Sequence, residues 1–182
     1  ARALLAMPDL RAEGLREMAA VAADVRADAR MRGDLLIEIA RQQTRDKQYD
    51  AAIATLARMP SVGVPKHLHY DFKAAVEAGR VYLAAGKGDE ALKQAELGME
   101  LWVEPDPDGA FLAAWWLKGD ALVYLKKRDE MVAHYQAALK LRIMREDLLA
   151  EIEHRIAMGY ASLGDVAAAA DSLAATLARY PK

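Results

Sequence analysis

The segment KGDEAL (87–92) has three counterparts in the chain, namely KQYDAA (47–52), KRDEMV (127–132) and LGDVAA (163–168). Each lies between two stretches of helical periodicity, as a turn between two helices does. Two sets of landmark residues flank these segments. The small residue two-thirds along the helix before the turn is Ala40, Gly79, Gly119 or Ala157. The residue near the start of the helix after the turn is Ala52, Ala91, Met131 or Ala169.

Both sets of landmarks keep the same spacing of 39, 40 and 38 residues. Two independent positions with one period indicate internal repeats, each of them a pair of antiparallel helices. Apolar residues recur three and four positions apart, and the alternation typical of strands is missing. We therefore expect an all-α chain of about nine helices, each about 11 to 22 residues long, and no sheet.

Turn-forming residues set the expected boundaries within one domain that covers residues 1–182. The segment RGD (32–34) is read as a break before the first complete repeat, and EPDPDG (104–109) as a break between two later helices. A helix is expected to begin after Pro65, at HLHY. The expected elements are a second helix of a truncated repeat at 9–31 and four helical hairpins at 33–65, 66–104, 108–145 and 146–182.

The repeats resemble those of the tetratricopeptide repeat (TPR) family, whose motif is a bulky residue, a Leu-Gly pair, a Tyr, then Ala, an aromatic residue and a Pro. The resemblance covers residues 33 to 182. The first repeat matches at Leu36, Ile39, Ala40, Ala52 and Leu56, and the second at Gly79, Tyr82, Ala91 and Ala95. The third matches at Trp115, Gly119, Leu122, Met131, Tyr135 and Ala138, and the fourth at Ile156, Ala157, Tyr160, Ala169, Leu173 and Pro181.

The resemblance implies a right-handed α-solenoid of antiparallel helix hairpins. The period is about five residues longer than the roughly 34 of the family, which suggests helices longer by a turn, as in kinesin-light-chain-like and bacterial-regulator variants. The terminal Pro of the motif is clear only at Pro181. HEAT-like helix pairs of about 40 residues remain the structural alternative.

In this register, small residues alternate with large ones at the positions expected to face the interior. The small landmarks, such as Gly79 and Gly119, let the first helix of each repeat approach its partner closely. The larger residues at 82, 115, 135 and 160 then fill the remaining space, and because one hairpin cannot bury its own faces, the repeats stack. Replacing Gly79 or Gly119 by Leu is expected to overpack this contact.

One stripe of the first helices lines the concave groove in proteins of this family, and the resemblance places a mixed set of side chains there. Cations gather toward its beginning, aromatic residues stand in the middle, and acidic residues follow. The candidate groove residues are Arg41, Arg45, Lys73, Arg80, Trp116, Asp120, Tyr124 and His154. Arg, Trp and Tyr are enriched at binding hot spots. The expected ligand is a peptide that is acidic at one end and has an apolar anchor.

Neighbouring Trp115 and Trp116 point about 100° apart on a helix. Trp115 shares a stripe with Gly119 and is expected inside, whereas Trp116 belongs to the groove stripe. Two alternatives stay open for Trp116: contact with a ligand, or packing on the helix of the neighbouring repeat. The groove arginines have two alternatives as well, ligand binding or pairing within the groove, for example with Asp120.

Composition excludes several classes of function. The 25 basic and 27 acidic residues give a net charge of −2, which gives no global attraction to nucleic acid or to an anionic membrane. The chain contains no cysteine, so disulfides, thiolate metal sites and a cysteine nucleophile are excluded. No apolar run approaches the roughly 18 residues of a membrane span, and no signal-peptide pattern is recognised in the sequence. The chain is expected to be a piece of a longer protein; its compartment is open, with the cytoplasm favoured.

No catalytic constellation, metal site or cofactor site is expected. The histidines of HLH (67–69) lie two positions apart and point about 200° apart on a helix, which disfavours chelation. EIEH (151–154) has the Glu-x-x-His spacing of di-iron bundles but lacks the second pair. GKGD (86–89) lacks the Lys-Ser/Thr and the preceding strand of a phosphate loop.

The sequence therefore predicts a non-catalytic interaction module that holds a peptide or a partner segment in its groove. A regulatory peptide-sensing domain of a larger bacterial regulator is the first alternative. Self-association through residues 165–182 is the second, because Leu173 and Leu177 lie on an apolar face that no following helix covers.

Overall fold

The computed structural model describes residues 11–102, 111–140 and 146–180, and the regular structure within these ranges is helical throughout. The helices are α1 (Arg11–Ala23), α2 (Ala29–Arg45), α3 (Tyr49–Leu56), α4 (Tyr70–Ala84), α5 (Gly88–Leu101), α6 (Leu112–Tyr124), α7 (Arg128–Ala138), α8 (Glu146–Ser162) and α9 (Val166–Arg179). Two short 3-10 turns, η3 (Met59–Val62) and η4 (Lys66–Leu68), lie before α4. The all-α prediction is confirmed, while the predicted break at 104–109 and Pro181 lie outside the described residues.

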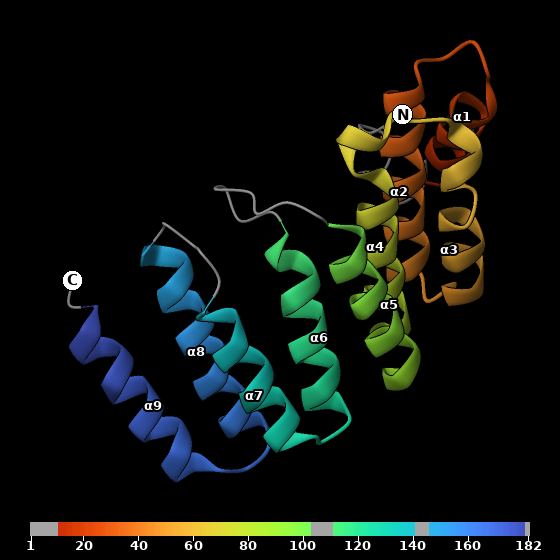
Figure 1. Cartoon of the computed structure of the whole chain (residues 1–182). Coiled ribbons are helices and arrows are strands. Elements are labelled where there is room, and N and C mark those ends of the chain that lie inside the picture. Colours follow the sequence, from red (N-terminus) through yellow and green to blue (C-terminus); the bar gives the residue numbers. More distant parts are fainter. Residues whose placement is uncertain (1–10, 103–110, 141–145, 181–182) are drawn as a thin grey trace. The chain divides into compact units, whose positions relative to one another are not determined.

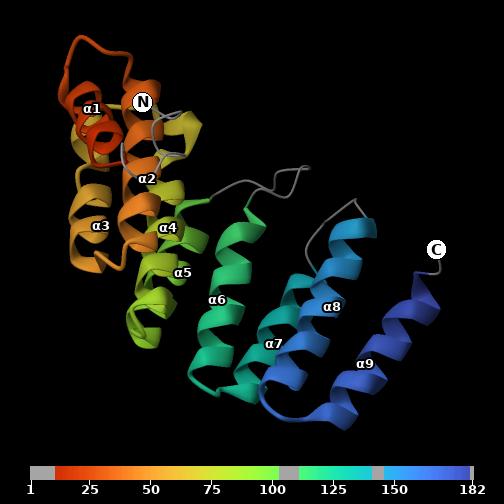
Figure 2. The ribbon, with the colours of Figure 1, turned by 180° about the vertical axis from the view of Figure 1, so that it is seen from behind.

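Contacts divide the chain into two compact units, residues 1–86 and 87–182, and each unit is described by itself. In the first unit, α2 packs against α1, α3 and α4. In the second unit, α5 packs on α6, α6 on α7, α7 on α8 and α8 on α9, and α6 also contacts α8. Figures 1 and 2 show α2 beside α3, and α8 beside α9, as antiparallel neighbours from both sides. The expected single domain over 1–182 stays a prediction.

The two sets of landmark residues lie in the interior. The small residues of the first helices, Ala40, Gly79, Gly119 and Ala157, are all buried. The residues that begin the second helices, Ala52, Ala91, Met131 and Ala169, are buried as well. The interior positions predicted from the repeat period are therefore confirmed.

Gly119 and Tyr135 show how the interior is filled. A Cβ built on Gly119 would overlap the Tyr135 hydroxyl and ring, so the glycine makes room for the aromatic side chain of α7. Tyr135 is fully buried, as expected for a space-filling residue. Tyr82, Trp115 and Tyr160, predicted for the same role, are only half-buried. The Tyr160 ring lies under the Arg128 guanidinium, whose carbon is 5.0 Å from the ring centroid.

The turns between paired helices share a backbone feature that the sequence alone does not reveal. Lys47, Gly86, Lys126 and Gly164 all have positive φ, and they are spaced by the same 39, 40 and 38 residues. The amide of each donates to the carbonyl three residues earlier, at 3.0 Å. In the turns at Lys47, Lys126 and Gly164 the next amide reaches back five residues, from 48 to 43, from 127 to 122 and from 165 to 160. This pair of bonds is the Schellman motif that ends a helix.

The predicted break at RGD (32–34) is wrong. Helix α2 begins at Ala29, after Asp28 accepts a capping bond of 3.0 Å from the Met31 amide. The chain turns instead between α1 and α2, so the expected helix at 9–31 is divided. Gly33 is a packing residue, because a Cβ there would lie 2.6 Å from Cε1 of Tyr70.

The helix expected after Pro65 begins later than HLHY indicates. Residues 66–68 form the single turn η4, and His69 takes a left-handed conformation at φ 52° before α4 begins at Tyr70. A left-handed residue cannot continue a right-handed helix, which separates the two elements.

Candidate functional site

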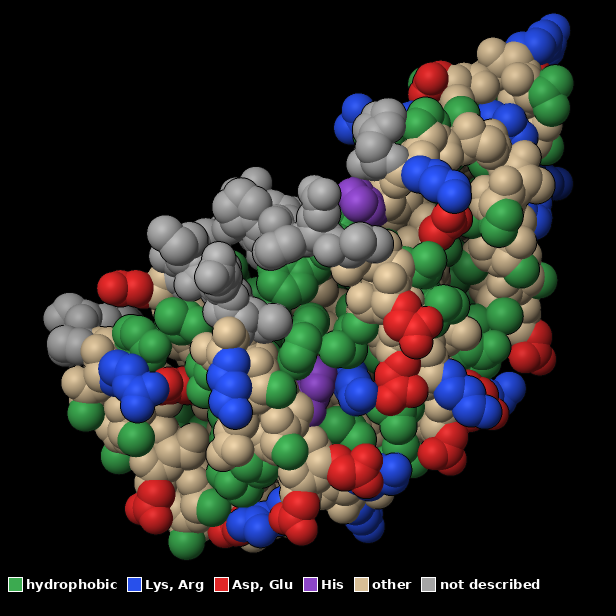
Figure 3. Space-filling model, in the orientation of Figure 1, with side chains coloured by type: hydrophobic (Ala, Val, Ile, Leu, Met, Phe, Trp, Pro, Cys, Tyr) green, Lys and Arg blue, Asp and Glu red, His purple; other side chains and the backbone are tan. Residues whose placement is uncertain are grey.

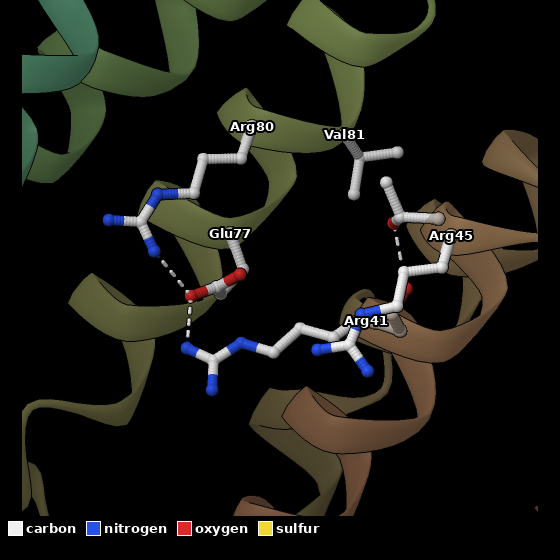
Figure 4. A pocket seen from close by; sticks show the side chains of 7 residues that line it. Arg41, Arg45, Glu77, Arg80 and Val81 are labelled. Carbon is white, nitrogen blue, oxygen red and sulfur yellow. Dashed lines mark hydrogen bonds and ion pairs between the residues drawn. The ribbon is translucent and has the colours of Figure 1, made fainter. Parts of the chain in front are cut away.

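Three of the candidate groove residues meet in a pocket of the first unit. Arg41 and Arg45 are four positions apart on α2, so they share one face of that helix, and Arg80 projects from α4. Together with Ala40, Thr44, Glu77 and Val81 they line a cavity of about 210 Å³ (Figure 4). The structure thus brings together Arg41, Arg45 and Arg80 as a basic cluster, which is called the arginine pocket below.

Glu77 is the residue of this pocket that the sequence analysis missed. Its side chain is buried, with 7% of the residue exposed. One carboxylate oxygen, Oε1, accepts from Arg41 Nη2 at 2.5 Å and from Arg80 Nη1 at 2.8 Å (Figure 4). The hydrogen bond to Glu77 raises the pKa of the Arg41 guanidinium above its ordinary value. The i,i+3 spacing of Glu77 and Arg80 was the available signal for the pair.

The cations of the pocket are more exposed than the anion they contact. The side chains of Arg41 and Arg80 are 45% and 51% exposed, and Arg45 is an exposed residue. Within the described part of the chain, the Arg45 guanidinium has no ion-pair partner. Three guanidinium groups and one carboxylate leave a local charge of +2. Such a site attracts an anion.

Lys73 does not join the arginine pocket, although it was predicted for the same groove. Its Nζ lies over the Tyr70 ring, 4.3 Å from the centroid. The Tyr70 hydroxyl donates to Asp34 Oδ1 at 2.5 Å. Burial and this bond raise the pKa of Tyr70 to about 12. Lys73 is therefore part of an aromatic contact at the start of α4.

Trp116, in the second unit, packs against the following repeat. The residue is half-buried, and the Arg155 guanidinium of α8 covers its indole at 4.5 Å from the ring centroid. Arg155 Nε also donates to Glu151 Oε1 at 3.1 Å, and its Nη1 lies 3.5 Å from Asp120 Oδ1. This contact is packing on a neighbouring helix, one of the two alternatives for Trp116, and contact with a ligand stays a prediction. Asp120 pairs with Arg155, whereas Arg41 and Arg80 pair with Glu77.

The other two candidates of the second unit lie at the surface. Tyr124, at the end of α6, is exposed, and a Cβ on Gly88 would lie 2.6 Å from its Cδ1. His154 is exposed on α8, next in sequence to Arg155. In the first unit the structure thus brings together Arg41, Arg45 and Arg80, and in the second it brings Trp116 and Asp120 to Arg155.

Trp115 makes a contact that sequence reasoning did not foresee. Its ring stacks on His134 of α7, with centroids 4.7 Å apart and planes inclined by 17°. His134 Nε2 lies 2.9 Å from the Trp115 carbonyl oxygen, so this nitrogen carries the proton and donates. Burial, with a smaller contribution from Lys118, lowers the pKa of His134. The neutral imidazole is thereby part of the packing between α6 and α7.

The surface carries both signs of charge. Figure 3 shows Lys and Arg side chains interspersed with Asp and Glu on the face it presents.

Among the described residues, no group of three or more His, Cys, Asp or Glu side chains is arranged to hold a metal ion. None of the helices in the described ranges combines the length and apolar character that a membrane crossing requires. Comparisons with models of known protein families, with curated proteins and with solved structures give no match.

Proposed function

We propose that the chain is a non-catalytic interaction module that binds an acidic peptide or partner segment. Its helices are proposed to form a right-handed TPR-like solenoid. The buried landmarks at one period, the recurrent Schellman turns and the contacts between alternate helices, α2 with α4 and α6 with α8, support this architecture.

The arginine pocket is the observation that carries the proposal. Arg41 and Arg80 come from two different helices and contact one buried carboxylate, while both side chains stay about half exposed at the cavity they line. Arginine presents five N–H donors in a planar fork that matches an oxyanion. An acidic side chain or a terminal carboxylate of a bound segment fits such a pocket.

The second unit carries exposed apolar side chains of its own. Tyr124 on α6 and Met158 on α8 are both exposed large side chains. Since Arg155 already covers the Trp116 indole, we propose Tyr124 and Met158 as a separate apolar contact site of this unit, with Trp116 as a supporting residue.

Peptide libraries test the proposal. Fluorescent degenerate heptapeptides with a fixed central residue of Glu, Lys or Leu would be titrated into the full chain and followed by fluorescence polarisation. The Glu library is expected to bind best, and Arg45→Glu is expected to remove the preference. Lys73→Glu is the matched control, because it makes the same charge change in the same unit outside the pocket. Equal binding of the three libraries would refute the proposal.

Self-association through α9 is a second candidate function. Val166 and Leu177 on this helix are 73% and 68% exposed, unusual values for apolar side chains. Light scattering against concentration tests it: Leu177→Lys should keep the chain monomeric where the wild type associates. A monomeric wild-type mass at high concentration would remove this candidate.

A further inference from the structure

We propose that the group held by the arginine pocket is a phosphorylated side chain of the bound segment, with Glu77 acting as the positioning residue. This step rests on the proposed peptide-binding function. It narrows the ligand from any acidic residue to a dianion.

The charge of the pocket is the first argument. Its lining contributes three guanidinium groups and one carboxylate, a net charge of +2. A phosphoserine or phosphothreonine carries about −1.5 to −2 at neutral pH, whereas a carboxylate carries −1. Glu38 of α2 also interacts electrostatically with Arg41, more weakly than Glu77, but it accepts from Gln42 Nε2 at 2.9 Å and does not line the cavity. A dianion therefore neutralises the pocket, and a single carboxylate leaves it positive.

The geometry around Glu77 is the second argument. Arg41 and Arg80 contact the same oxygen, Oε1, so one buried atom fixes the positions of two guanidinium groups from two helices. Each group uses one nitrogen for this bond and keeps further N–H donors for a ligand. A phosphoryl group offers three acceptor oxygens, enough to engage several guanidinium forks at once. Because the forks are fixed before binding, less side-chain entropy is lost.

Arg45 provides the third argument. A pocket built only to stabilise Glu77 would need no additional cation, since Arg41 and Arg80 already contact the carboxylate. Arg45 nevertheless lines the same cavity, and among the described residues no carboxylate pairs with it. It is the cation most available to a ligand, which makes it the residue of choice for a test.

The experiment compares three degenerate heptapeptide libraries with central phosphoserine, Glu or Ser, titrated into the full chain. We expect the phosphoserine library to bind at least about tenfold more tightly than the Glu library, the equivalent of one buried charge-assisted contact. Arg45→Gln should reduce phosphoserine binding to the level of Glu. Lys73→Gln, which removes a cation from the same unit outside the pocket, should leave it unchanged. Arg45 is exposed and unpaired within the described residues, so its variant should fold, and circular dichroism would check this.

Each alternative outcome has a distinct meaning. Equal binding of the phosphoserine and Glu libraries would overturn the phosphate assignment and leave acidic-peptide binding intact. Absence of binding by both would overturn the proposed function as well. Inorganic phosphate is the competitor: half-inhibition at a concentration similar to that of the phosphoserine library would overturn the assignment to a peptide side chain. Loss of binding in Lys73→Gln as large as in Arg45→Gln would place the anion outside the pocket.

Glu77 has its own readout. Glu77→Gln raises the net charge of the pocket, so charge alone predicts tighter phosphoserine binding. If the carboxylate positions the arginines, binding should instead weaken several-fold, and the side-chain Nε–Hε NMR signals of Arg41 and Arg80 should broaden or shift without ligand. Tighter binding in this variant would overturn the positioning role.

Discussion

Replacing Gly119 by Ala should lower stability and replacing Gly159 by Ala should not, although both glycines are buried in helices of the second unit. In a helix, Ala is favoured over Gly by about 0.5–1 kcal/mol, so propensity alone predicts that both variants are more stable. The packing of the added methyl group decides otherwise at one of the two positions.

At Gly119 the methyl group would meet a rigid neighbour. It would overlap the Tyr135 hydroxyl and Cζ and would lie 2.7 Å from Cε2. The ring is buried and cannot bend, so the backbone or the ring must shift, at a typical overpacking cost of about 1–3 kcal/mol. After subtraction of the propensity gain, we expect Gly119→Ala to destabilise the unit by up to about 2 kcal/mol.

At Gly159 the neighbour is flexible. A Cβ would lie 2.6 Å from Cε and 2.7 Å from Sδ of Met131, the far end of a side chain with three rotatable bonds. Met131 can turn away at small cost, so Gly159→Ala should range from neutral to about 1 kcal/mol more stable.

Urea denaturation followed by tryptophan fluorescence measures both variants, because Trp102, Trp115 and Trp116 all lie within the second unit. A Tyr135→Leu background provides the control. Leu lacks the hydroxyl and Cζ that overlap the methyl group, so the cost of Gly119→Ala should fall there. The reasoning fails if Gly119→Ala is as stable as Gly159→Ala, or if its cost is the same with Tyr135 and with Leu.

Three further predictions concern a turn, the arginine pocket and a histidine. Lys126→Gly should raise the free energy of unfolding by about 0.5–1 kcal/mol, because glycine adopts φ 59° without the energetic penalty that a side chain brings in the left-handed region. Urea denaturation measures the change, and a less stable variant would contradict the prediction. The double variant Arg41→Met, Arg80→Met leaves the buried carboxylate of Glu77 without its cations and should lower the free energy of unfolding by about 1–3 kcal/mol. Glu77→Gln should lower it less, because water can solvate the two arginines. Unfolding followed by circular dichroism measures both, and equal losses would contradict this expectation. Burial keeps the pKa of His134 in the folded chain below its ordinary 6.5, so as the pH falls the unfolded chain takes up the proton first. The contribution of neutral His134 to the free energy of unfolding is therefore fully present above pH 6.5 and is lost as the pH falls through the folded pKa. Unfolding at several pH values should show a flatter profile for His134→Phe, and unchanged slopes would speak against it.

Repeat spacing predicted the interior well because it depends on local periodicity. Small residues at one period, such as Gly79 and Gly119, indicated close helix contacts directly from the sequence. The break at 32–34 failed for a physical reason: Gly33 serves a close approach to Tyr70, and a packing glycine has the same local appearance as a helix-breaking one. Only the residue opposite the glycine distinguishes the two.

The candidate site was predicted in part. Arg41, Arg45 and Arg80 were found from the groove stripe that the family resemblance implies. Glu77 was missed because its role depends on Arg41, 36 residues away, and on burial that no local pattern reports. The packing of Trp116 was not predictable for the same reason, since Arg155, which covers its indole, comes from the next repeat.

The recurrent turn has a consequence for recombination between repeats. Excising residues 127–164 would join Lys126 to Asp165, so the positive-φ residue of one turn would be followed by the residue that comes after Gly164, its equivalent one period later. The backbone would keep its register, but Leu173 would take the place of Tyr135 opposite Gly119. The spliced chain would carry a void where a ring had been. Repeats of this protein can thus replace one another without a change of backbone register, but their packing residues do not match. A duplication or deletion that preserves the packing has to keep each glycine together with the aromatic residue that packs against it, as Gly119 does with Tyr135.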